Sequence, residues 1–458
     1  MNMRYPHLLL SCLFLSCVCL AVRAQPASVR VELDGIPPGA RRFSVVAFRD
    51  YLSLAPEFLA EKSVTGSRAE LEFRLDGPRW VRVTGPYVNS DLIAVPGHTY
   101  RLALVPEGET YYVERSNAGL PASDPNIYCD SVNVLVNAYL RRHNTLLYSG
   151  RMARQTAAYC DSVQKLFTGV KSDLFQTFLG FRLAELRVLS GVWSEQAMFK
   201  MQFEGRPFRP ENPDYAYAFG EFYKGRLTQA FLKNKMTHGK DLLNGFRGTD
   251  TLMKLLAAEK YYPGNEVGEG ALLLGLTELL RNKDYSTDGL LYAFNRLADS
   301  SRYAPVRDLA ARLYKKYKAP SYGSPAPELA IADKTDQVVQ PDARRAAYVC
   351  FLDPKSEVTV SELAAMIELK KKLKEKVVLV PVIINAEKAD LVRMQTSQRL
   401  TFELYRNLSV AVLADYRLKG DCTCMVLSPD GRYLQPSAPV PSDPTLGDKL
   451  LELAKTVR

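Results

Sequence analysis

Cysteine is the residue type in this sequence whose spacing can support chemistry. The chain of 458 residues contains eight cysteines and four histidines. Cys422 and Cys424 are separated by one residue, so on a β-strand their side chains would share one face. A cysteine thiolate can attack a disulfide or bind a soft metal ion, which makes this pair a candidate for redox or metal chemistry. The same pattern also fits two inert thiols buried in a strand.

Three other cysteines follow the N-terminal segment. Cys350 lies in the apolar run 347–352, which predicts a buried strand from which its thiol could pair with Cys422. Cys129 and Cys160 each lie in the sequence Tyr-Cys-Asp-Ser-Val on successive predicted helices. If these helices pair, the two cysteines can form a disulfide, and the alternative is two buried free thiols. A metal site would have only three cysteines as ligands, Cys350, Cys422 and Cys424, with no histidine to complete the set. We therefore predict no metal and no cofactor.

Residues 1–24 are typical of a secretory signal peptide. Arg4 precedes the apolar stretch 8–22, and Val22 and Ala24 form a Val-x-Ala cleavage site. The stretch is shorter than a membrane-spanning helix needs, so we predict cleavage rather than a membrane anchor. The residues before Cys17 match a lipid-attachment site only in part, which leaves lipidation as a lesser alternative. Cleavage removes Cys12, Cys17 and Cys19 and leaves an odd number of cysteines, so at least one thiol has no partner within the chain.

Composition and charge exclude several classes of protein. A hydrophobic content of 47% and a charged content of 24% are typical of a soluble globular protein, and the length exceeds what one core holds. The net charge of +10 is spread along the chain, and the basic cluster 370–376 predicts a solvated helix face. The sequence has no Gly-x-Ser-x-Gly, His-Glu-x-x-His or Walker pattern. We therefore predict no nucleic-acid binding and no transmembrane segment after cleavage, and we rank a hydrolase last.

The pattern of apolar residues predicts a multidomain α+β protein with three domains. In residues 25–118, short alternating runs such as Val29–Leu33 are separated by turn residues, which predicts an antiparallel β-sandwich. Residues 119–318 have apolar residues at helical spacing, beginning at the Asp124-Pro125 cap, and predict an α-helical domain. After a Pro- and Ser-containing linker at 319–325, strands and helices alternate in residues 323–458, with one helix expected from 389 to about 407. This alternation predicts a small α/β domain.

Two features of the first two domains can be interpreted as core or as ligand sites. The segment 215–223 is rich in aromatic residues, which predicts a core stripe, with a carbohydrate-binding face as the alternative. His98 follows a Val-Pro-Gly turn and has no partner histidine nearby, so we interpret it as a loop residue rather than a metal ligand.

Four segments of the C-terminal domain carry a resemblance to a known family: the segment 323–329, the strand 348–351, and the segments 418–420 and 425–431. On these segments, residues 323–458 resemble the exported thioredoxin-like disulfide reductases of the bacterial envelope, with the last two around the position of the family's cis-proline. The whole chain also resembles Gram-negative envelope proteins that place a β domain and a helical domain before such a module. The resemblance implies a thioredoxin-like α/β fold for the C-terminal domain, a place in the periplasm or outer envelope, and a link to redox homeostasis.

The residues on which the family's chemistry depends are altered in this chain. The resemblance places Ser356 and Thr359 where the family has its two redox cysteines, and neither hydroxyl can form a disulfide. We expect Ser356 to cap the helix that follows. Cys422 stands at the cis-proline position and is followed by Thr423, which the family keeps. Because a cis bond before a residue other than proline costs about 3 kcal/mol, we expect the peptide before Cys422 to be trans.

Two functions follow from these alterations. The sequence favours a non-catalytic envelope protein that binds or scaffolds a peptide, a glycan or a partner protein, because the dithiol is lost while the fold pattern is kept. The alternative is a thiol-disulfide oxidoreductase of an unusual type that uses Cys422. The sequence makes no prediction of the oligomeric state.

Overall fold

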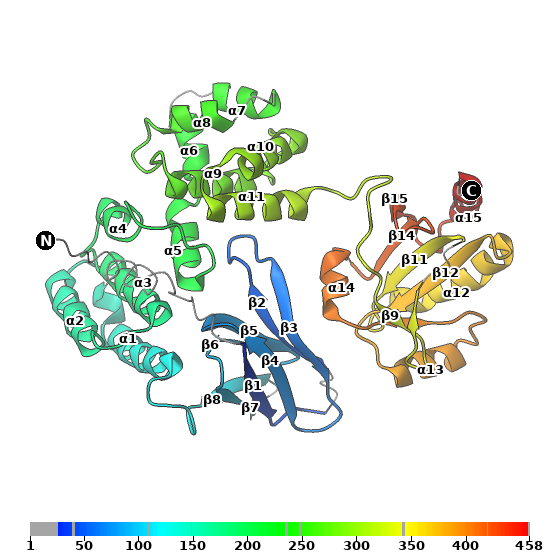
Figure 1. The fold of residues 1–458 in the computed structure, drawn as a ribbon, viewed down its shortest axis with the longest axis horizontal. Coiled ribbons are helices and arrows are strands. Elements are labelled where there is room, and N and C mark those ends of the chain that lie inside the picture. Colours follow the sequence, from blue (N-terminus) through cyan, green and yellow to red (C-terminus); the bar gives the residue numbers. More distant parts are fainter. Residues whose placement is uncertain are drawn as a thin grey trace, which may run out of the picture. The chain divides into compact units, whose positions relative to one another are not determined.

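The computed structural model describes residues 26–38, 42–108, 110–147, 149–233, 237–246, 249–340, 344–418 and 420–456. The predicted signal peptide, with Cys12, Cys17 and Cys19, lies outside these residues. The chain divides into two compact units, of which the first ends at Lys316 and the second begins at Tyr317 (Figure 1). The mixed α+β class is confirmed, because the described residues contain several sheets and many helices. The predicted domain boundaries stay predictions.

Strands make up the first part of the first unit. They are β1 (Ala27–Asp34), β2 (Arg42–Phe48), β3 (Pro56–Ser63), β4 (Ala69–Leu75), β5 (Arg79–Gly85), β6 (Val88–Ala94), β7 (Thr99–Glu107) and β8 (Thr110–Ser116). Among the described residues they form two four-stranded sheets, ordered β4-β1-β7-β8 and β3-β2-β5-β6. Val31 of β1 and Val81 of β5 belong to one hydrophobic cluster, so the two sheets share a core.

One strand pair differs from the antiparallel expectation. β1 and β7 pair in parallel, with Val31 opposite Tyr100, whereas the other pairs in these two sheets are antiparallel. A parallel pair needs a long crossover connection, and the chain between β1 and β7 provides one because it contains five other strands. Alternation along a single strand predicts which residues are buried, but it does not predict the direction of the neighbouring strand.

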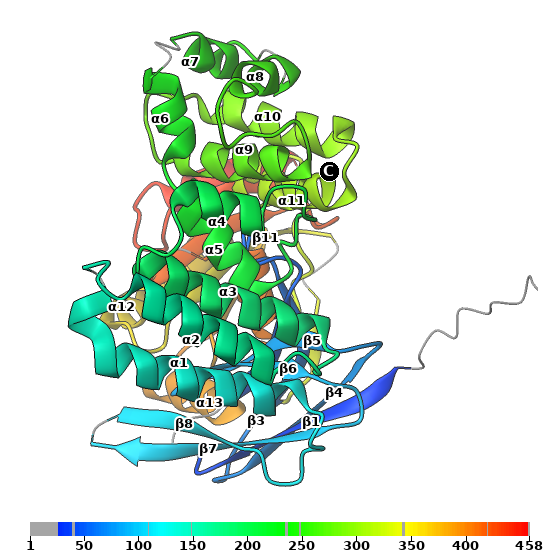
Figure 2. The ribbon, with the colours of Figure 1, turned by 90° about the vertical axis from the view of Figure 1, so that its left-hand side faces the viewer.

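Helices make up the rest of the first unit. They are α1 (Pro125–Leu147), α2 (Ala153–Leu166), α3 (Asp173–Leu189), α4 (Glu195–Gln202), α5 (Pro213–Tyr223), α6 (Arg226–Lys233), α7 (Thr237–Asn244), α8 (Thr249–Leu256), α9 (Glu266–Leu279), α10 (Thr287–Ser300) and α11 (Ala304–Tyr317). α1 begins at Pro125 as predicted, and Figure 2 shows α1, α2 and α3 side by side. Trp80 of β5 and Ile93 of β6 share a hydrophobic cluster with these three helices, which joins the helices to a sheet.

The aromatic segment of α5 is mostly core. Tyr215, Phe219 and Tyr223 are no more than 2% exposed, which confirms the core interpretation for these side chains. Tyr217 points away from this core and is 69% exposed. The exposed side of α5 therefore presents one aromatic ring, that of Tyr217, and not a continuous aromatic face for carbohydrate binding.

The second unit is built on one mixed sheet. Its elements are β9 (Ile331–Ala332), β10 (Val338–Val339), β11 (Ala346–Leu352), α12 (Glu357–Leu373), β12 (Val377–Ile383), α13 (Lys388–Ser397), β13 (Tyr405–Asn407), α14 (Val410–Asp415), β14 (Cys422–Leu427), β15 (Tyr433–Ala438) and α15 (Leu446–Thr456). The described strands are ordered β10-β9-β13-β12-β11-β14-β15. β11 is parallel to β12 and antiparallel to β14, and it is buried on both faces of the sheet, which explains its continuous apolar run.

The helix expected from 389 to about 407 is too long. α13 ends at Ser397, and Tyr405–Asn407 form β13, which pairs with β12. Arg399 has a positive φ of 52°, a left-handed conformation that does not continue an α-helix. Tyr405–Asn407 are a strand because they pair with β12. The spacing of apolar residues within a short segment does not indicate such a pairing.

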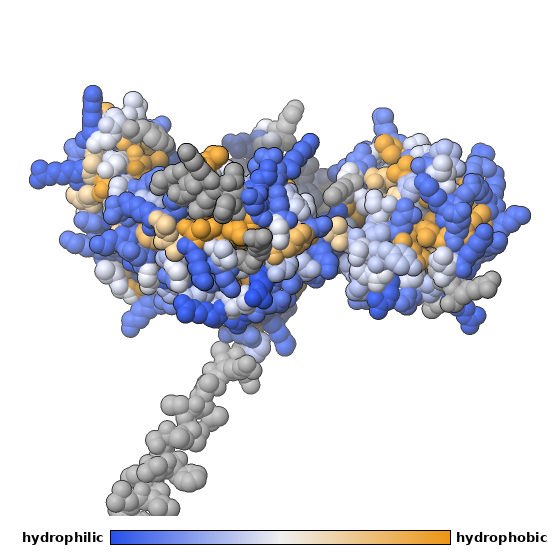
Figure 3. Space-filling model, turned by 90° about the horizontal axis from the view of Figure 1, so that it is seen from above, coloured by the Kyte–Doolittle hydropathy of each residue, from blue (hydrophilic) through white to orange (hydrophobic). Residues whose placement is uncertain are grey.

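The exposed surface is largely hydrophilic. On the face that Figure 3 shows, apolar residues form small patches between hydrophilic ones. Several large apolar side chains are exposed on different elements, among them Val134, Leu166, Tyr217 and Leu232. No helix among the described residues has both the length and the apolar composition needed to cross a membrane.

Candidate three-cysteine site

Two neighbouring strands place three cysteines together in the second unit. Cys350 of β11 lies directly opposite Cys424 of β14, and Cys422 is opposite Leu352 in the same antiparallel pair. Because alternate residues of a strand share a face, Cys422 and Cys424 both lie on the face to which Cys350 contributes. Cys350 is 0% exposed, Cys424 is 4% exposed, and Cys422 is half-buried.

The three sulfur atoms are within direct contact of one another. The Sγ atoms of Cys350 and Cys424 are 2.8 Å apart. The Sγ atom of Cys422 lies 3.4 Å from that of Cys350 and 3.5 Å from that of Cys424. Each sulfur can therefore donate to or accept from either of the others. Cys350 and Cys424 face each other directly, whereas Cys422 is diagonal to Cys350 and two residues from Cys424, so its Cα atom lies about 7 Å from theirs and a disulfide from Cys422 also needs the backbone to move.

The electrostatics of the cluster favour one thiolate and two thiols. Hydrogen bonds from Cys350 and Cys424 lower the pKa of Cys422, against the opposing effects of partial burial and of the neighbouring Asp421. Burial raises the pKa of Cys350, and its bond to Cys422 acts in the same direction. The hydrogen bond with Cys350 lowers the pKa of Cys424, but the bond to Cys422 and burial together raise it above its ordinary value. The half-buried thiol is thus the one that ionises first.

The N-terminus of α12 lies beside the cluster. Ser356 is its N-cap residue, as predicted, and its hydroxyl oxygen accepts a hydrogen bond from the backbone N–H of Val358 at 3.2 Å. The same hydroxyl donates to Asp421 Oδ2 at 2.8 Å, which ties the helix start to the residue before Cys422. Thr359 is 1% exposed and donates to the carbonyl of Asp353 at 2.5 Å. Both hydroxyls therefore have structural roles.

The backbone before Cys422 is trans, in agreement with the expectation from the sequence. No cis peptide bond occurs among the described residues. Cys422 opens β14 and Thr423 follows it within the strand, so this segment is regular strand. This regular backbone is what allows Cys422 and Cys424 to point to one face.

Cys129 and Cys160 belong to the first unit. Both are buried, and neither is joined in a disulfide in the structure. Burial raises the pKa of each thiol, that of Cys160 to about 11. A disulfide between them stays a prediction, and in the reduced state both thiols are protonated and unreactive.

The cluster is also a candidate for binding a soft metal ion. Within the part of the chain that the structure describes, Cys350, Cys422 and Cys424 are the group of three ligand-type residues whose donor atoms lie within 4.8 Å of one another. Thiolates suit Zn²⁺ or Cu⁺, but a structural zinc site has four protein ligands, and this group supplies three. Thiol chemistry needs no fourth residue, so the arrangement suits disulfide exchange better.

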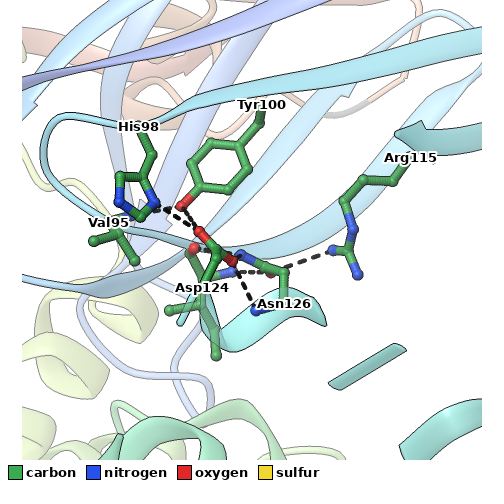
Figure 4. A network of polar contacts seen from close by, with 7 residues as sticks. Val95, His98, Tyr100, Arg115, Asp124 and Asn126 are labelled. Atoms are coloured by element: carbon green, nitrogen blue, oxygen red, sulfur yellow. Dashed lines mark hydrogen bonds and ion pairs between the residues drawn. The ribbon is translucent and has the colours of Figure 1, made fainter. Parts of the chain in front are cut away.

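A second polar cluster lies in the first unit, where sequence analysis identified a loop histidine and a helix cap. Asp124 is 0% exposed, and its Oδ2 lies 2.7 Å from His98 Nδ1 and accepts from the Tyr100 hydroxyl at 2.9 Å (Figure 4). Its Oδ1 accepts from the backbone N–H and the side-chain amide of Asn126, both at 2.8 Å. Arg115 donates to Asn126 Oδ1 at 3.3 Å. The network joins β7 to the start of α1, so we assign it to stability.

The chain is similar over part of its length to solved structures of bacterial thioredoxin-like proteins. The thioredoxin domain of a thiol-disulfide oxidoreductase from Bacteroides vulgatus is 17% identical, and the match covers 31% of this chain and 100% of that one with a TM-score of 0.26. A thiol:disulfide interchange protein from a Bacteroides species is 16% identical, with coverage of 31% and 92% and a TM-score of 0.26. For a thioredoxin family protein from Chlorobium tepidum the identity is 14%, the coverage 30% and 99%, and the TM-score 0.25.

No protein-family model matches the chain, and no curated protein matches it. The likeness to the solved structures is confined to about 30% of the chain. The chemistry therefore has to be argued from the residues of this chain.

Proposed function

We propose that this chain is an exported thiol-disulfide exchange protein in which Cys422 attacks and Cys350 or Cys424 resolves. The observation that carries the proposal is the contact of all three sulfur atoms within 3.5 Å, with Cys422 half-buried and the other two buried. In this proposal residues 323–458 form a thioredoxin-like domain that follows a β-sandwich and a helical domain. The protein would act in the periplasm or outer envelope of a Gram-negative bacterium, after removal of residues 1–24.

The first step is attack on a substrate disulfide. The Cys422 thiolate bonds to one substrate sulfur, the substrate S–S bond breaks, and the departing sulfur takes the electron pair and then a proton from water. Substrate and Cys422 are now joined by a mixed disulfide. The hydrogen bonds from Cys350 and Cys424 favour the negative charge on Cys422 before the attack.

The second step uses one of the two buried thiols. Cys350 or Cys424 loses its proton to the second substrate sulfur as that sulfur departs, and its own sulfur bonds to Cys422. Two electrons have then passed from the cluster to the substrate, which leaves as a dithiol. A dithiol reductant from outside the chain has to reduce the new disulfide before another cycle. The same steps in reverse would oxidise a dithiol substrate.

The aromatic disulfide 5,5′-dithiobis(2-nitrobenzoate) tests this assignment in the purified mature chain. Wild-type protein should release two equivalents of the coloured thiolate in a fast phase and retain no adduct, because the second thiol displaces the first product. Cys422→Ser should slow the fast phase by about 100-fold, since the remaining thiols are buried and protonated. Replacing the resolving cysteine by serine should leave a stable one-to-one adduct. The matched control is Cys160→Ser, which removes a buried thiol of the other unit and should change nothing.

The pH dependence of alkylation distinguishes Cys422 from an ordinary thiol. A free thiol with a pKa of about 8.5 loses about tenfold in rate for each pH unit below that value, because its thiolate fraction falls. The pKa of Cys422 is lowered by its two hydrogen bonds, so its thiolate persists and its iodoacetamide rate at pH 6 should stay close to that at pH 8. Peptide mass spectrometry reads this rate separately for each cysteine. Cys350→Ala should restore a steep pH profile to Cys422 by removing one donor.

Slow alkylation of all three clustered thiols would contradict the proposal. The non-catalytic protein would then be the better account, with an envelope protein or a peptide as its partner. A metal ion found by elemental analysis of the natively exported protein, lost in Cys422→Ser, would instead identify the cluster as a metal site.

A further inference from the structure

A polar cavity in the first unit is independent of the cysteine cluster. Its volume is about 670 Å³, within the range of about 300–1,000 Å³ that small-molecule sites occupy. Residues of α2, α3, α4 and α5 line it together with the loops at 193 and 206–209. Figure 2 shows α2, α3, α4 and α5 next to one another in the first unit. The thiol chemistry proposed above uses none of these residues.

Gly180 lies in the cavity wall next to a space that no other side chain fills. It lies inside α3, where glycine is less favourable than alanine because it loses more backbone entropy on folding. A Cβ atom added at Gly180 would meet no atom within 4 Å, and φ at this residue is not positive. Neither a close neighbour nor a special backbone conformation requires the glycine. Since Gly180 lines the cavity, the missing side chain enlarges the room available to a ligand.

The charges and rings of the lining define the class of ligand. Arg187 is paired with Asp161 at 3.0 Å and lies over the ring of half-buried Trp193, 5.1 Å from the guanidinium carbon to the ring centre. Arg206 and Arg209 are exposed and add two positive charges, against one further carboxylate at Asp173. Glutamine and threonine side chains complete the lining and can both donate and accept hydrogen bonds.

We propose that this cavity binds an acidic saccharide. A sugar ring offers hydroxyl groups that donate and accept, a flat face of C–H groups that packs on Trp193, and a carboxylate or sulfate that pairs with Arg206 or Arg209. Gly180 leaves room for the ring. The apolar alternative is disfavoured, because a ligand without polar groups would leave the charged lining unpaired.

An array of oligosaccharides tests the proposal with the full mature chain. It should carry uronic-acid oligomers, sulfated oligosaccharides and neutral oligomers of matching length. We expect retention of one or more acidic members over their neutral counterparts, and a weaker signal at high salt because exposed charges are screened. Titration calorimetry with the best acidic member then gives Kd for wild-type protein and variants.

Three variants examine whether the cavity is the site. Gly180→Leu fills the space beside the glycine, Trp193→Ala removes the ring on which the sugar packs, and Arg206→Gln removes one exposed charge. Each variant should raise Kd at least about tenfold. Arg142→Gln removes an exposed charge of α1 outside the cavity and should leave Kd unchanged. Circular dichroism confirms that each variant is folded, and Arg206→Gln, whose side chain is exposed, carries the test if another variant unfolds.

The proposal is overturned if no acidic oligosaccharide binds, or if neutral oligomers bind as tightly. It is also overturned if binding persists unchanged in both Gly180→Leu and Arg206→Gln. Since Cys422→Ser leaves the cavity intact, its saccharide affinity should equal that of wild type, which separates this proposal from the thiol chemistry.

Discussion

Asp124→Ala is expected to lower the free energy of unfolding of the first unit by about 3–5 kcal/mol, as removal of one partner from a buried charged network does. The carboxylate is fully buried and receives hydrogen bonds from Tyr100 and Asn126 and contacts His98. Burial raises the pKa of Tyr100, so its hydroxyl stays protonated and acts as a donor. In the alanine variant these donors stay buried without an acceptor, which costs more than the lost bonds themselves.

Guanidinium unfolding followed by circular dichroism measures this change. Asp308→Ala, which replaces an exposed aspartate of α11, is the matched control and should change stability by less than about 0.5 kcal/mol. Asp124→Asn keeps the shape and one acceptor oxygen, so it should fall between wild type and alanine. A loss below about 1 kcal/mol in Asp124→Ala would show that the network does not hold β7 and α1 together.

Asp50→Ala is expected to have the second largest effect, about 3 kcal/mol. Asp50 follows β2, is 0% exposed, and accepts from Arg312 Nε at 2.5 Å and from the Ser53 hydroxyl at 2.5 Å. Arg312 belongs to α11, 262 residues further along the chain. Lys316 on the same helix donates to the Ser53 carbonyl at 2.7 Å. Loss of the carboxylate leaves a largely buried guanidinium unpaired and loosens the attachment of α11 to the β2–β3 connection.

A double-mutant cycle isolates this ion pair from other effects. Arg312→Met with Asp50→Ala should be more stable than the sum of the single losses predicts, by about 1–3 kcal/mol. Glu221→Ala, which breaks an exposed pair with Lys224, is the control and should cost less than about 1 kcal/mol. Additive losses from Asp50 and Arg312 would mean that the two residues act separately.

The features that depend on only a few neighbouring residues were predicted best from the sequence. The N-caps at Asp124 and Ser356 and the strand around Cys350 are where they were expected, because caps and alternation depend on a few neighbouring residues. The strand Tyr405–Asn407 and the parallel pairing of β1 with β7 were not predicted. Both depend on partners that lie far away in the chain, and local periodicity contains no record of them.

The polar networks show the same division. Asp124 was predicted as a cap, but its contacts with His98 and Tyr100 were not, since they need the β6–β7 turn to lie against α1. A buried aspartate carries no sequence signal that distinguishes it from an exposed cap. The space beside Gly180 was likewise invisible, because it is bounded by helices and loops from several parts of the chain.

The sequence by itself determined that Cys422 and Cys424 share a face, because a strand repeats every two residues. It also determined that Ser356 and Thr359 cannot act as a redox pair, because hydroxyl groups form no disulfide. Only the tertiary structure decided that Cys350 lies opposite Cys424 and that all three sulfurs meet. That outcome depends on the register between β11 and β14. Cys350 and Cys422 lie 72 positions apart in the sequence, so the register stays open until both faces of the sheet are buried.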